Sequence, residues 1–167
     1  LDYVSTGALS LNGGSIVNGV GVAASLTLAS PGAAGSLAAN KAIVVDTTAP
    51  TTTASIGTVT DNVGPVQGTL TSGATTDDTS LQLSGSLSAL LLTDEALAVY
   101  DGLTRLGTAT VAGTSWSFTD TTLANGATPS YTVRVEDAAG NQGPASSPAF
   151  TATISTTPPT VANVTST

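Results

Sequence analysis

Carboxylate side chains gather in several short polar stretches that separate the apolar ones. Asp77 and Asp78 are adjacent, Asp61 precedes a polar stretch that runs to Pro65, and Asp94 is followed by Glu95. Adjacent acids repel each other unless a cation offsets the repulsion. Calcium takes about six to eight oxygen ligands from carboxylates, backbone carbonyls and water. These residue types therefore predict calcium sites built from loops, with Asp61, Asp77 and Asp78 among the ligands.

A second interpretation of the same acids is purely local. Asp and Asn favour turns because their side chains hydrogen-bond to nearby backbone groups. We expect Asp94, Glu95 and Asp101 to be solvated loop acids and Asp120 to be a turn residue. For Asp77 and Asp78 both interpretations stay open.

The overall charge limits the partners. Eleven acids face three bases, Lys41, Arg105 and Arg134, and the net charge is −8. Nucleic acids and anionic lipid surfaces attract basic proteins, so we expect neither as a partner, whereas cations fit. The longest strongly apolar run, Ala89 to Leu92, is far too short to span a bilayer, and we expect no membrane insertion.

The residues offer little for catalysis. The chain has no Cys and no His, which removes thiolate nucleophiles, imidazole bases and His metal ligands. Paired carboxylates can cleave glycosides, but Asp77-Asp78 and Asp94-Glu95 lie among small or aliphatic residues, with no aromatic residue beside them in sequence to hold a sugar. We predict that the protein is not an enzyme.

Short strands must position these acids. Leu81 to Leu87 and Tyr131 to Val135 alternate apolar and polar residues, which is the period of a strand with one face buried. Trp116 and Phe118 fall on one strand face, and Asn125-Gly126 marks a turn. We expect an all-β chain of about seven strands without a convincing helix; the remaining strands are predicted at 51–60, 96–101, 105–111 and 149–155, with a hairpin turn at Gly102.

Two similar phrases divide the chain into domains. Val45 to Thr51 reads VDTTAPT and Ile154 to Thr160 reads ISTTPPT, identical at four of seven positions. They lie about a hundred residues apart, the length of one immunoglobulin-like β-sandwich. We therefore predict a tandem array: residues 1–46 are the C-terminal part of a preceding repeat, 47–156 are a complete immunoglobulin-like domain, and 157–167 are a linker and the first strand of a following repeat.

The N-terminal segment is predicted to be a partial second sandwich. Asn12-Gly13-Gly14 after Leu9-Ser10-Leu11 is a hairpin signal. Further strands are expected at 25–28 and 41–45, with a loop over 30–36. Three or four strands bury a core poorly, so the missing half belongs to the parent chain or to another chain.

Six phrases, in order, resemble a known family. They cover residues 46–160 and resemble the bacterial immunoglobulin-like repeats of giant biofilm-associated and RTX-type surface adhesins. The phrases are Val45–Pro50, Thr76–Thr79, Val99–Gly102, Leu106–Ala109, Trp116–Phe118 and Val135–Asn141.

The resemblance implies a Greek-key sandwich that serves as a structural extender, or stalk, in a secreted protein on the bacterial cell surface. Such a stalk holds a ligand-binding tip away from the cell in adhesion and biofilm formation, and calcium stiffens the repeats. It also points to Asp46, Asp137 and Asn141 as calcium ligands, with Asp46 at the same end of the sandwich as Asp94, Glu95 and Asp137. The acids Asp61, Asp77 and Asp78 are expected at the opposite end.

The second linker departs from the first at one position that matters. Ser155 stands where the first linker has Asp46. We therefore expect the entry junction to be stiffer than the exit junction.

Two other functions remain open. The chain could be a subunit of a self-assembling filament or surface layer, in which the strand at 160–167 of one copy completes the half-domain at 1–46 of another. It could also be a tip that binds carbohydrate or protein, although no aromatic cluster rises out of the repeat pattern. The partners expected first are neighbouring repeats of the same chain.

Overall fold

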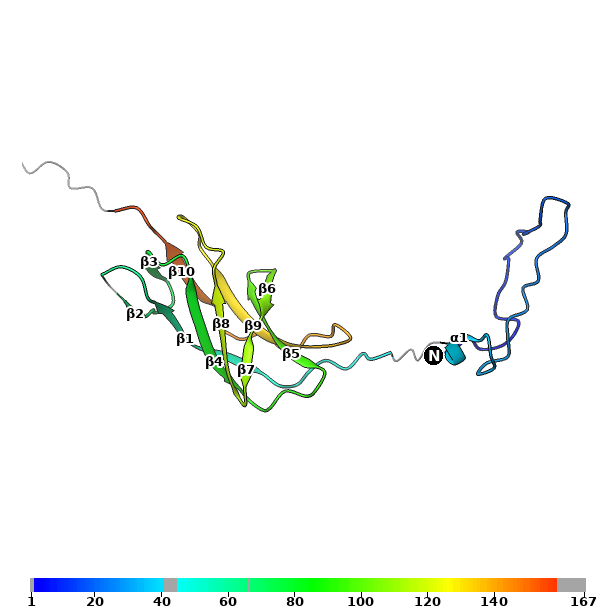
Figure 1. Ribbon diagram of the computed structural model, residues 1–167, viewed down its shortest axis with the longest axis horizontal. Helices are drawn as coiled ribbons and strands as arrows, with labels where there is room; N and C mark the ends of the chain where they lie inside the picture. The colour runs from blue at the N-terminus through cyan, green and yellow to red at the C-terminus, as the bar shows by residue number, and fades with distance from the viewer. Residues whose placement is uncertain (1, 41–44, 66, 159–167) are drawn as a thin grey trace, which may run out of the picture. The chain divides into compact units, whose positions relative to one another are not determined.

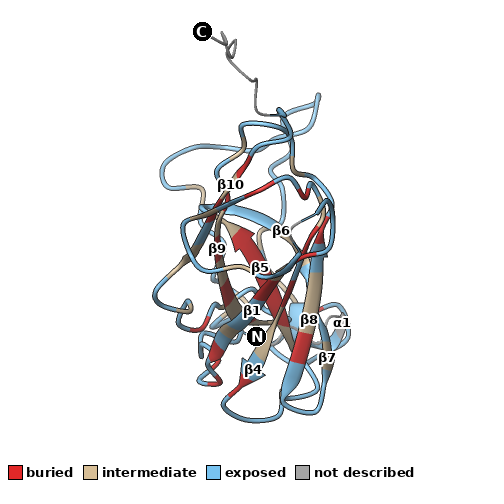
Figure 2. Ribbon diagram, turned by 90° about the vertical axis from the view of Figure 1, so that its left-hand side faces the viewer, coloured by how far each residue is buried: buried red, intermediate tan, exposed pale blue. Residues whose placement is uncertain are grey.

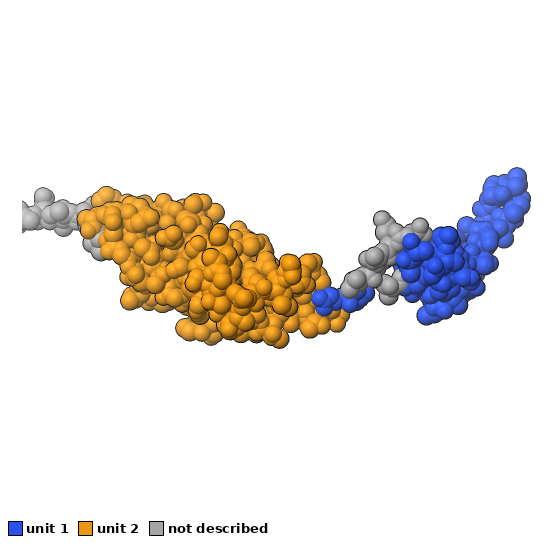
Figure 3. All heavy atoms as spheres, turned by 60° about the horizontal axis from the view of Figure 1, so that its bottom comes forward, with its two compact units in different colours: residues 1–46 blue, residues 47–167 orange. Residues whose placement is uncertain are grey.

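The chain consists of two units. The computed structural model describes residues 2–40, 45–65 and 67–158, and it divides the chain into Leu1–Asp46 (unit 1) and Thr47–Thr167 (unit 2). Figure 3 colours the two units separately. Each unit is described by itself below.

Unit 2 is built from two five-stranded sheets (Figure 1). The first has the strand order β2-β1-β4-β8-β7 and the second has the order β3-β10-β9-β5-β6. The pairings are antiparallel, apart from the parallel pair of β3 and β10. The strands are β1 (Ala54–Asp61), β2 (Gly68–Thr69), β3 (Ala74–Thr76), β4 (Leu81–Leu87), β5 (Glu95–Asp101), β6 (Thr104–Thr108), β7 (Thr110–Ala112), β8 (Ser115–Asp120), β9 (Ser130–Asp137) and β10 (Phe150–Ile154).

The core lies between the two sheets, as in a β-sandwich. Alternate residues of β4 and β9 face the core, which is the period-two pattern that predicted these two strands. Figure 2 shows the buried positions along strands of both sheets. The core contains Val59, Leu81, Leu83, Leu97, Val99, Trp116, Tyr131, Val133, Val135 and Ile154.

Trp116 explains a glycine in the middle of a strand. Its side chain is 3% exposed, and its indole Nε1 donates a hydrogen bond of 3.1 Å to the Ser55 carbonyl oxygen. Gly85 lies between them in the sheet, and a Cβ there would stand 1.9 Å from that carbonyl oxygen and 2.9 Å from the indole. Only glycine lets Trp116 and the backbone of β1 approach so closely.

The hairpin predicted around Gly102 forms, but its second strand, predicted over 105–111, is divided into β6 and β7. The chain leaves the second sheet after Thr108 and enters the first at Thr110, so that β6 pairs with β5 while β7 pairs with β8. Ala109, between them, is buried and donates its N–H to the Leu97 carbonyl oxygen at 2.8 Å. The described residues contain ten strands, whereas about seven were predicted. One additional strand comes from this division, and the other two are β2 and β3, which at two and three residues are too short to show a period in the sequence.

The first strand begins three residues later than predicted. Residues 51–53 are not in the ladder, although Thr53 donates its N–H to Ser88 Oγ at 3.0 Å and accepts the Ser88 N–H at 2.9 Å. These bonds fasten the incoming chain to the end of β4.

The chain enters and leaves unit 2 at opposite ends. Ala54 at the start of β1 pairs with Leu87, whereas Asp61 at its end pairs with Gly68. Ile154 at the end of β10 pairs with Thr76, whose hydroxyl donates to Asp61. We call the end with the start of β1 the entry end and the end with Asp61 and Ile154 the exit end.

Unit 1 differs from its prediction. Its described residues contain one short helix, α1 (Leu37–Asn40), and no strand, so the strands predicted at 9–11 and 25–28 are wrong. Most of the predicted strand at 41–45 lies outside the described residues. The Asn12-Gly13 turn forms, with positive φ at both residues, but its flanks do not pair. Hydrogen bonds instead join Val17 and its neighbours to Val22–Ala24 in a small hairpin.

The apolar side chains of unit 1 are poorly covered. Val4 is 93% exposed and Val20 is 84% exposed. Without a partner sheet, alternating residues have no core to face, which is the physical reason that the predicted strands do not form. That residues 1–46 are the C-terminal part of a preceding repeat stays a prediction.

Candidate functional site

The predicted calcium residues at the exit end are mostly bonded within the protein. Asp61 is 5% exposed; its Oδ1 accepts the Val63 N–H at 2.9 Å, and its Oδ2 accepts the Thr76 hydroxyl at 2.6 Å. Asp78 is fully buried and accepts the N–H groups of Asn62, at 3.1 Å, and Ser80, at 2.7 Å. Buried carboxylates need such donors. Here the hydrogen bonds of Asp61 and Asp78 connect the loop after β1 to the loop after β3.

Asp77 differs from its neighbours because it is exposed. It lines a pocket of about 300 Å³ together with Asp61, Thr76, Gln67 and Ser155. Gly64, with φ +72°, folds so tightly over this carboxylate that a Cβ at position 64 would lie 2.4 Å from Asp77 Oδ2. The pocket therefore offers oxygen atoms, with one carboxylate open to solvent.

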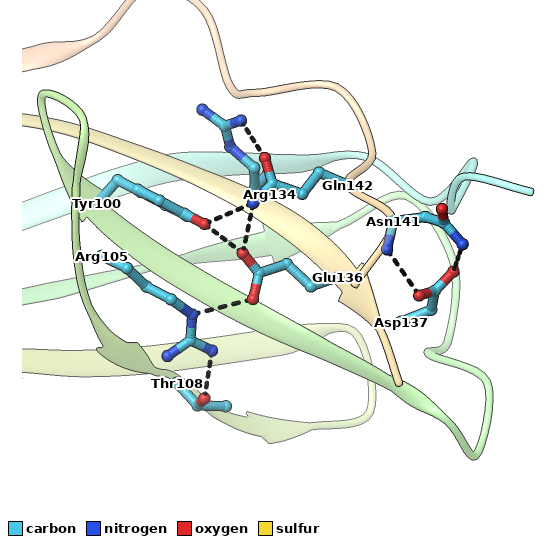
Figure 4. Close-up of polar contacts among 8 residues, drawn as sticks. All are labelled: Tyr100, Arg105, Thr108, Arg134, Glu136, Asp137, Asn141 and Gln142. Atoms are coloured by element: carbon cyan, nitrogen blue, oxygen red, sulfur yellow. Dashed lines mark hydrogen bonds and ion pairs between the residues drawn. The ribbon is translucent and has the colours of Figure 1, made fainter. Parts of the chain in front are cut away.

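At the entry end, Asp137 and Asn141 close a loop on each other (Figure 4). Asp137 Oδ1 accepts the N–H groups of Ala139 and Asn141, both at 2.9 Å, and Oδ2 accepts the Asn141 side-chain amide at 2.9 Å. The Asn141 amide and these backbone donors lower the pKa of Asp137 against the smaller opposing effect of burial. The short-range turn bonding expected of Asp and Asn is thus present.

Glu95 and Asp94 also lie at the entry end of the sandwich. Glu95 pairs with Asp137 across β5 and β9, and its Oε2 accepts the Leu92 N–H at 2.9 Å. Asp94 is exposed beside it. Asp46 is the last residue of unit 1 and is exposed; four residues later, the Pro50 carbonyl oxygen lies against Gly143 of unit 2.

The six predicted ligands therefore do not form one site. Asp61, Asp77 and Asp78 lie at the exit end, Asp137 and Asn141 lie at the entry end, and Asp46 lies in unit 1. Within residues 2–40, 45–65 and 67–158, no three Asp or Glu side chains are grouped so as to hold a metal ion. Calcium binding by these residues stays a prediction.

A polar network on the outer face of the second sheet was not foreseen (Figure 4). Glu136 lies at its centre, where one carboxylate oxygen accepts the Tyr100 hydroxyl and the other accepts Arg105 Nε at 2.9 Å. Gln142 donates to Tyr100 Oη at 2.9 Å and to Glu136 at 3.1 Å. The Arg134 guanidinium donates to Gln142 at 2.9 Å and stacks over the Tyr100 ring at 4.6 Å.

The network sets the charge of its members. Burial opposes ionisation of Glu136, but the hydrogen bonds from Tyr100 and Arg105 outweigh it and lower its pKa. Burial, followed by the bond to Glu136, raises the pKa of Tyr100. Both arginines of the chain take part. The alternation in 131–135 indicated that Arg134 faces outward, but only the strand register could reveal the partners across β5, β6 and β9.

Among the described residues, no helix has the length and hydropathy that a membrane span requires. No protein-family model, no curated protein and no solved structure matches the chain. The sandwich, its acidic ends and the network on its outer face are therefore the observations on which a function must rest.

Proposed function

We propose that unit 2 is an immunoglobulin-like extender repeat of a large secreted bacterial surface adhesin, and that calcium stiffens it. The observation that carries this proposal is the entry of the chain at one end of the sandwich and its exit at the other. Repeats joined through such units add length with every copy. The two similar linker phrases, which flank this unit, support the array.

The strand order supports the immunoglobulin-like Greek key. One sheet contains β1, β4, β8 and β7, and the other contains β5, β9 and β10, which is the ABED and CFG division of that fold with additional edge strands. The hydroxyl of Tyr131, near the start of β9, donates a hydrogen bond of 2.7 Å to the carboxylate of Asp120 at the end of β8. In immunoglobulin-like sandwiches a tyrosine near the start of the corresponding strand also bonds back across this corner, there to a backbone group.

The charge distribution supports a cation at the ends. The exposed acids of unit 2, such as Asp77 and Asp94, lie in end loops, and Glu136 on the outer face is paired with Arg105. The outer face of the first sheet has only small or uncharged residues in its aligned rows, which are Thr60, Gln82 and Thr119; Thr58, Ser84, Ser117 and Thr110; and Ser55, Ser86, Ser115 and Ala112. Facing ends of successive repeats would repel each other unless cations screen them.

The test is a thermal melt of the chain in EDTA, in 10 mM calcium and in 10 mM magnesium. A millimolar site should add about 1–2 kcal/mol in excess calcium, a rise of a few degrees in Tm. Asp77→Asn should reduce the calcium-specific rise by the share of the exit-end site, whereas Asp94→Asn, which changes an exposed acid that is not among the predicted ligands, should keep it in full. Equal melting temperatures in all three solutions would contradict the role of calcium.

The second candidate is a subunit that assembles by strand exchange. It is favoured by unit 1, whose described residues form no sheet and leave apolar side chains such as Val4 and Val20 uncovered. Sedimentation velocity separates the two functions. An extender should stay monomeric over a hundredfold range of concentration, whereas a strand-exchanging subunit should form larger species.

A further inference from the structure

The segment that leaves unit 2 is tied to the loop between β8 and β9. Asn125 in that loop accepts the Thr156 N–H at its Oδ1 (2.9 Å), and its Nδ2 reaches Thr157 Oγ1 at 3.4 Å. On the other side of the segment, the Ser155 N–H donates to the Thr76 carbonyl oxygen at 2.8 Å. The outgoing chain is thus bonded beyond the last residue of β10.

The backbone around Asn125 is itself fixed. The next residue, Gly126, has φ +85° and donates its N–H to the Ile154 carbonyl oxygen at 2.8 Å. Ala127 accepts the Ile154 N–H at 2.9 Å and donates to the Ala124 carbonyl oxygen at 3.0 Å. The residues after Asn125 are therefore bonded to β10, and the bond from Ala127 to Ala124 closes the turn that contains Asn125. This fixed turn places the side-chain amide of Asn125 beside residues 156 and 157.

We propose that Asn125 is a clasp that sets the direction in which the chain leaves unit 2, without any cation. Asparagine suits this role because one side chain supplies both an acceptor and a donor. Aspartate would keep the acceptor for the Thr156 N–H and lose the donor to Thr157. Alanine would lose both.

The clasp changes the expected balance between the two junctions. The linker sequence predicted a looser exit, because Ser155 stands where the entry linker has Asp46. At the exit, the side-chain amide of Asn125 holds residues 156 and 157 by hydrogen bonds. This junction therefore needs no cation to keep its direction. The inference goes beyond the calcium-stiffened extender, since it requires neither calcium nor a following repeat.

The experiment measures amide hydrogen exchange and ¹⁵N relaxation on the full chain in EDTA. In Asn125→Ala, exchange at the Thr156 amide should rise about tenfold, since the amide loses its protein acceptor, and the order parameters of residues 156 and 157 should fall. In Asn125→Asp, exchange at Thr156 should stay within about threefold of the parent, because the acceptor remains. Asn125 does not have a positive φ, since among the described non-glycine residues only Asn12 does. Alanine at position 125 therefore introduces no backbone strain.

Asn62→Ala is the matched control, since Asn62 is an exposed asparagine in another exit-end loop that bonds to Asp78 through its backbone. It should leave Thr156 unchanged. Unaltered exchange at Thr156 in Asn125→Ala would overturn the proposal. If alanine also speeds exchange at the core amide of Val133, Asn125→Leu decides, because leucine keeps the approximate size of the side chain and removes both of its polar groups. Exchange at Thr156 that is unaltered relative to Val133 in Asn125→Leu would overturn the proposal too. A failed calcium melt would leave the clasp untouched, since the exchange is measured in EDTA.

Discussion

Two single residues carry much of the specificity of the sandwich. Gly85 permits the contact between Trp116 and the backbone at Ser55, and Tyr131 fills the core while its hydroxyl reaches buried Asp120. Asp120 also accepts the N–H and the hydroxyl of Thr122, at 2.9 and 2.6 Å. Each residue acts through contacts that no similar side chain can reproduce.

Gly85→Ala should lower the free energy of unfolding by about 3 kcal/mol, because the new methyl group meets the backbone, which cannot rotate away. Gly57→Ala is the matched control on the neighbouring strand: its closest new contacts would be 3.5 and 3.6 Å, which is ordinary packing. Urea unfolding curves of both variants test this. A similar loss in both would show that the contact with Trp116 is not the cause.

Tyr131→Phe should cost about 1–3 kcal/mol, because the buried Asp120 carboxylate loses a donor while the ring remains. Tyr100→Phe offers a comparison on the outer face, where Gln142 and Arg105 still bond to Glu136, so a smaller loss is expected. Chemical denaturation of the pair measures the difference. If the two losses are equal, burial of the acceptor does not decide the cost.

At the scale of elements, the alternation of residues predicts what one strand can reveal by itself. Leu81 to Leu87 became β4 without error, since its buried face depends only on its own period. The crossing at Ala109 could not be predicted, because Arg105 to Val111 looks like one strand until β6 and β7 choose different partners. The same limit hid the network around Glu136, which exists only once β5, β6 and β9 are in register.

The network around Glu136 should make the sheet sensitive to acid. The pKa of Glu136 in the folded state lies below its ordinary value of 4.5, so its stabilising contribution is complete above that value and is lost as pH falls through the lowered pKa. Melting temperatures between pH 7 and pH 3 should therefore decline more steeply for the parent than for Glu136→Gln. Parallel curves for the two proteins would contradict this.

At the scale of the whole molecule, the core cluster lies entirely in unit 2, with members from Ala54 to Ile154. The division between the two units falls between Asp46 and Thr47, inside the phrase Val45–Thr51. The recurrence of this phrase is the signal that predicts a domain boundary from the sequence, and the array of repeats stays a prediction. It could not indicate the structure of unit 1, whose turn signals say nothing about whether the flanking residues find partners.

A fragment of residues 47–158 should therefore fold alone and melt within about 3 °C of the full chain, because it keeps every core contact. Calorimetry of both proteins provides the comparison. A fragment that melts far lower would mean that unit 1 contributes to the stability of the sandwich.

The opposite placement of entry and exit also has a mechanical consequence. Tension on the two ends pulls β1 toward the entry end and β10 toward the exit end, along the strands themselves. Because ladder hydrogen bonds run roughly across the strands, such a force loads the bonds of β1 with β4, and of β10 with β3 and β9, in shear and all together. Bonds loaded together resist rupture better than bonds that open one at a time. A sandwich of this topology that is pulled at its two ends should therefore unfold only at high force.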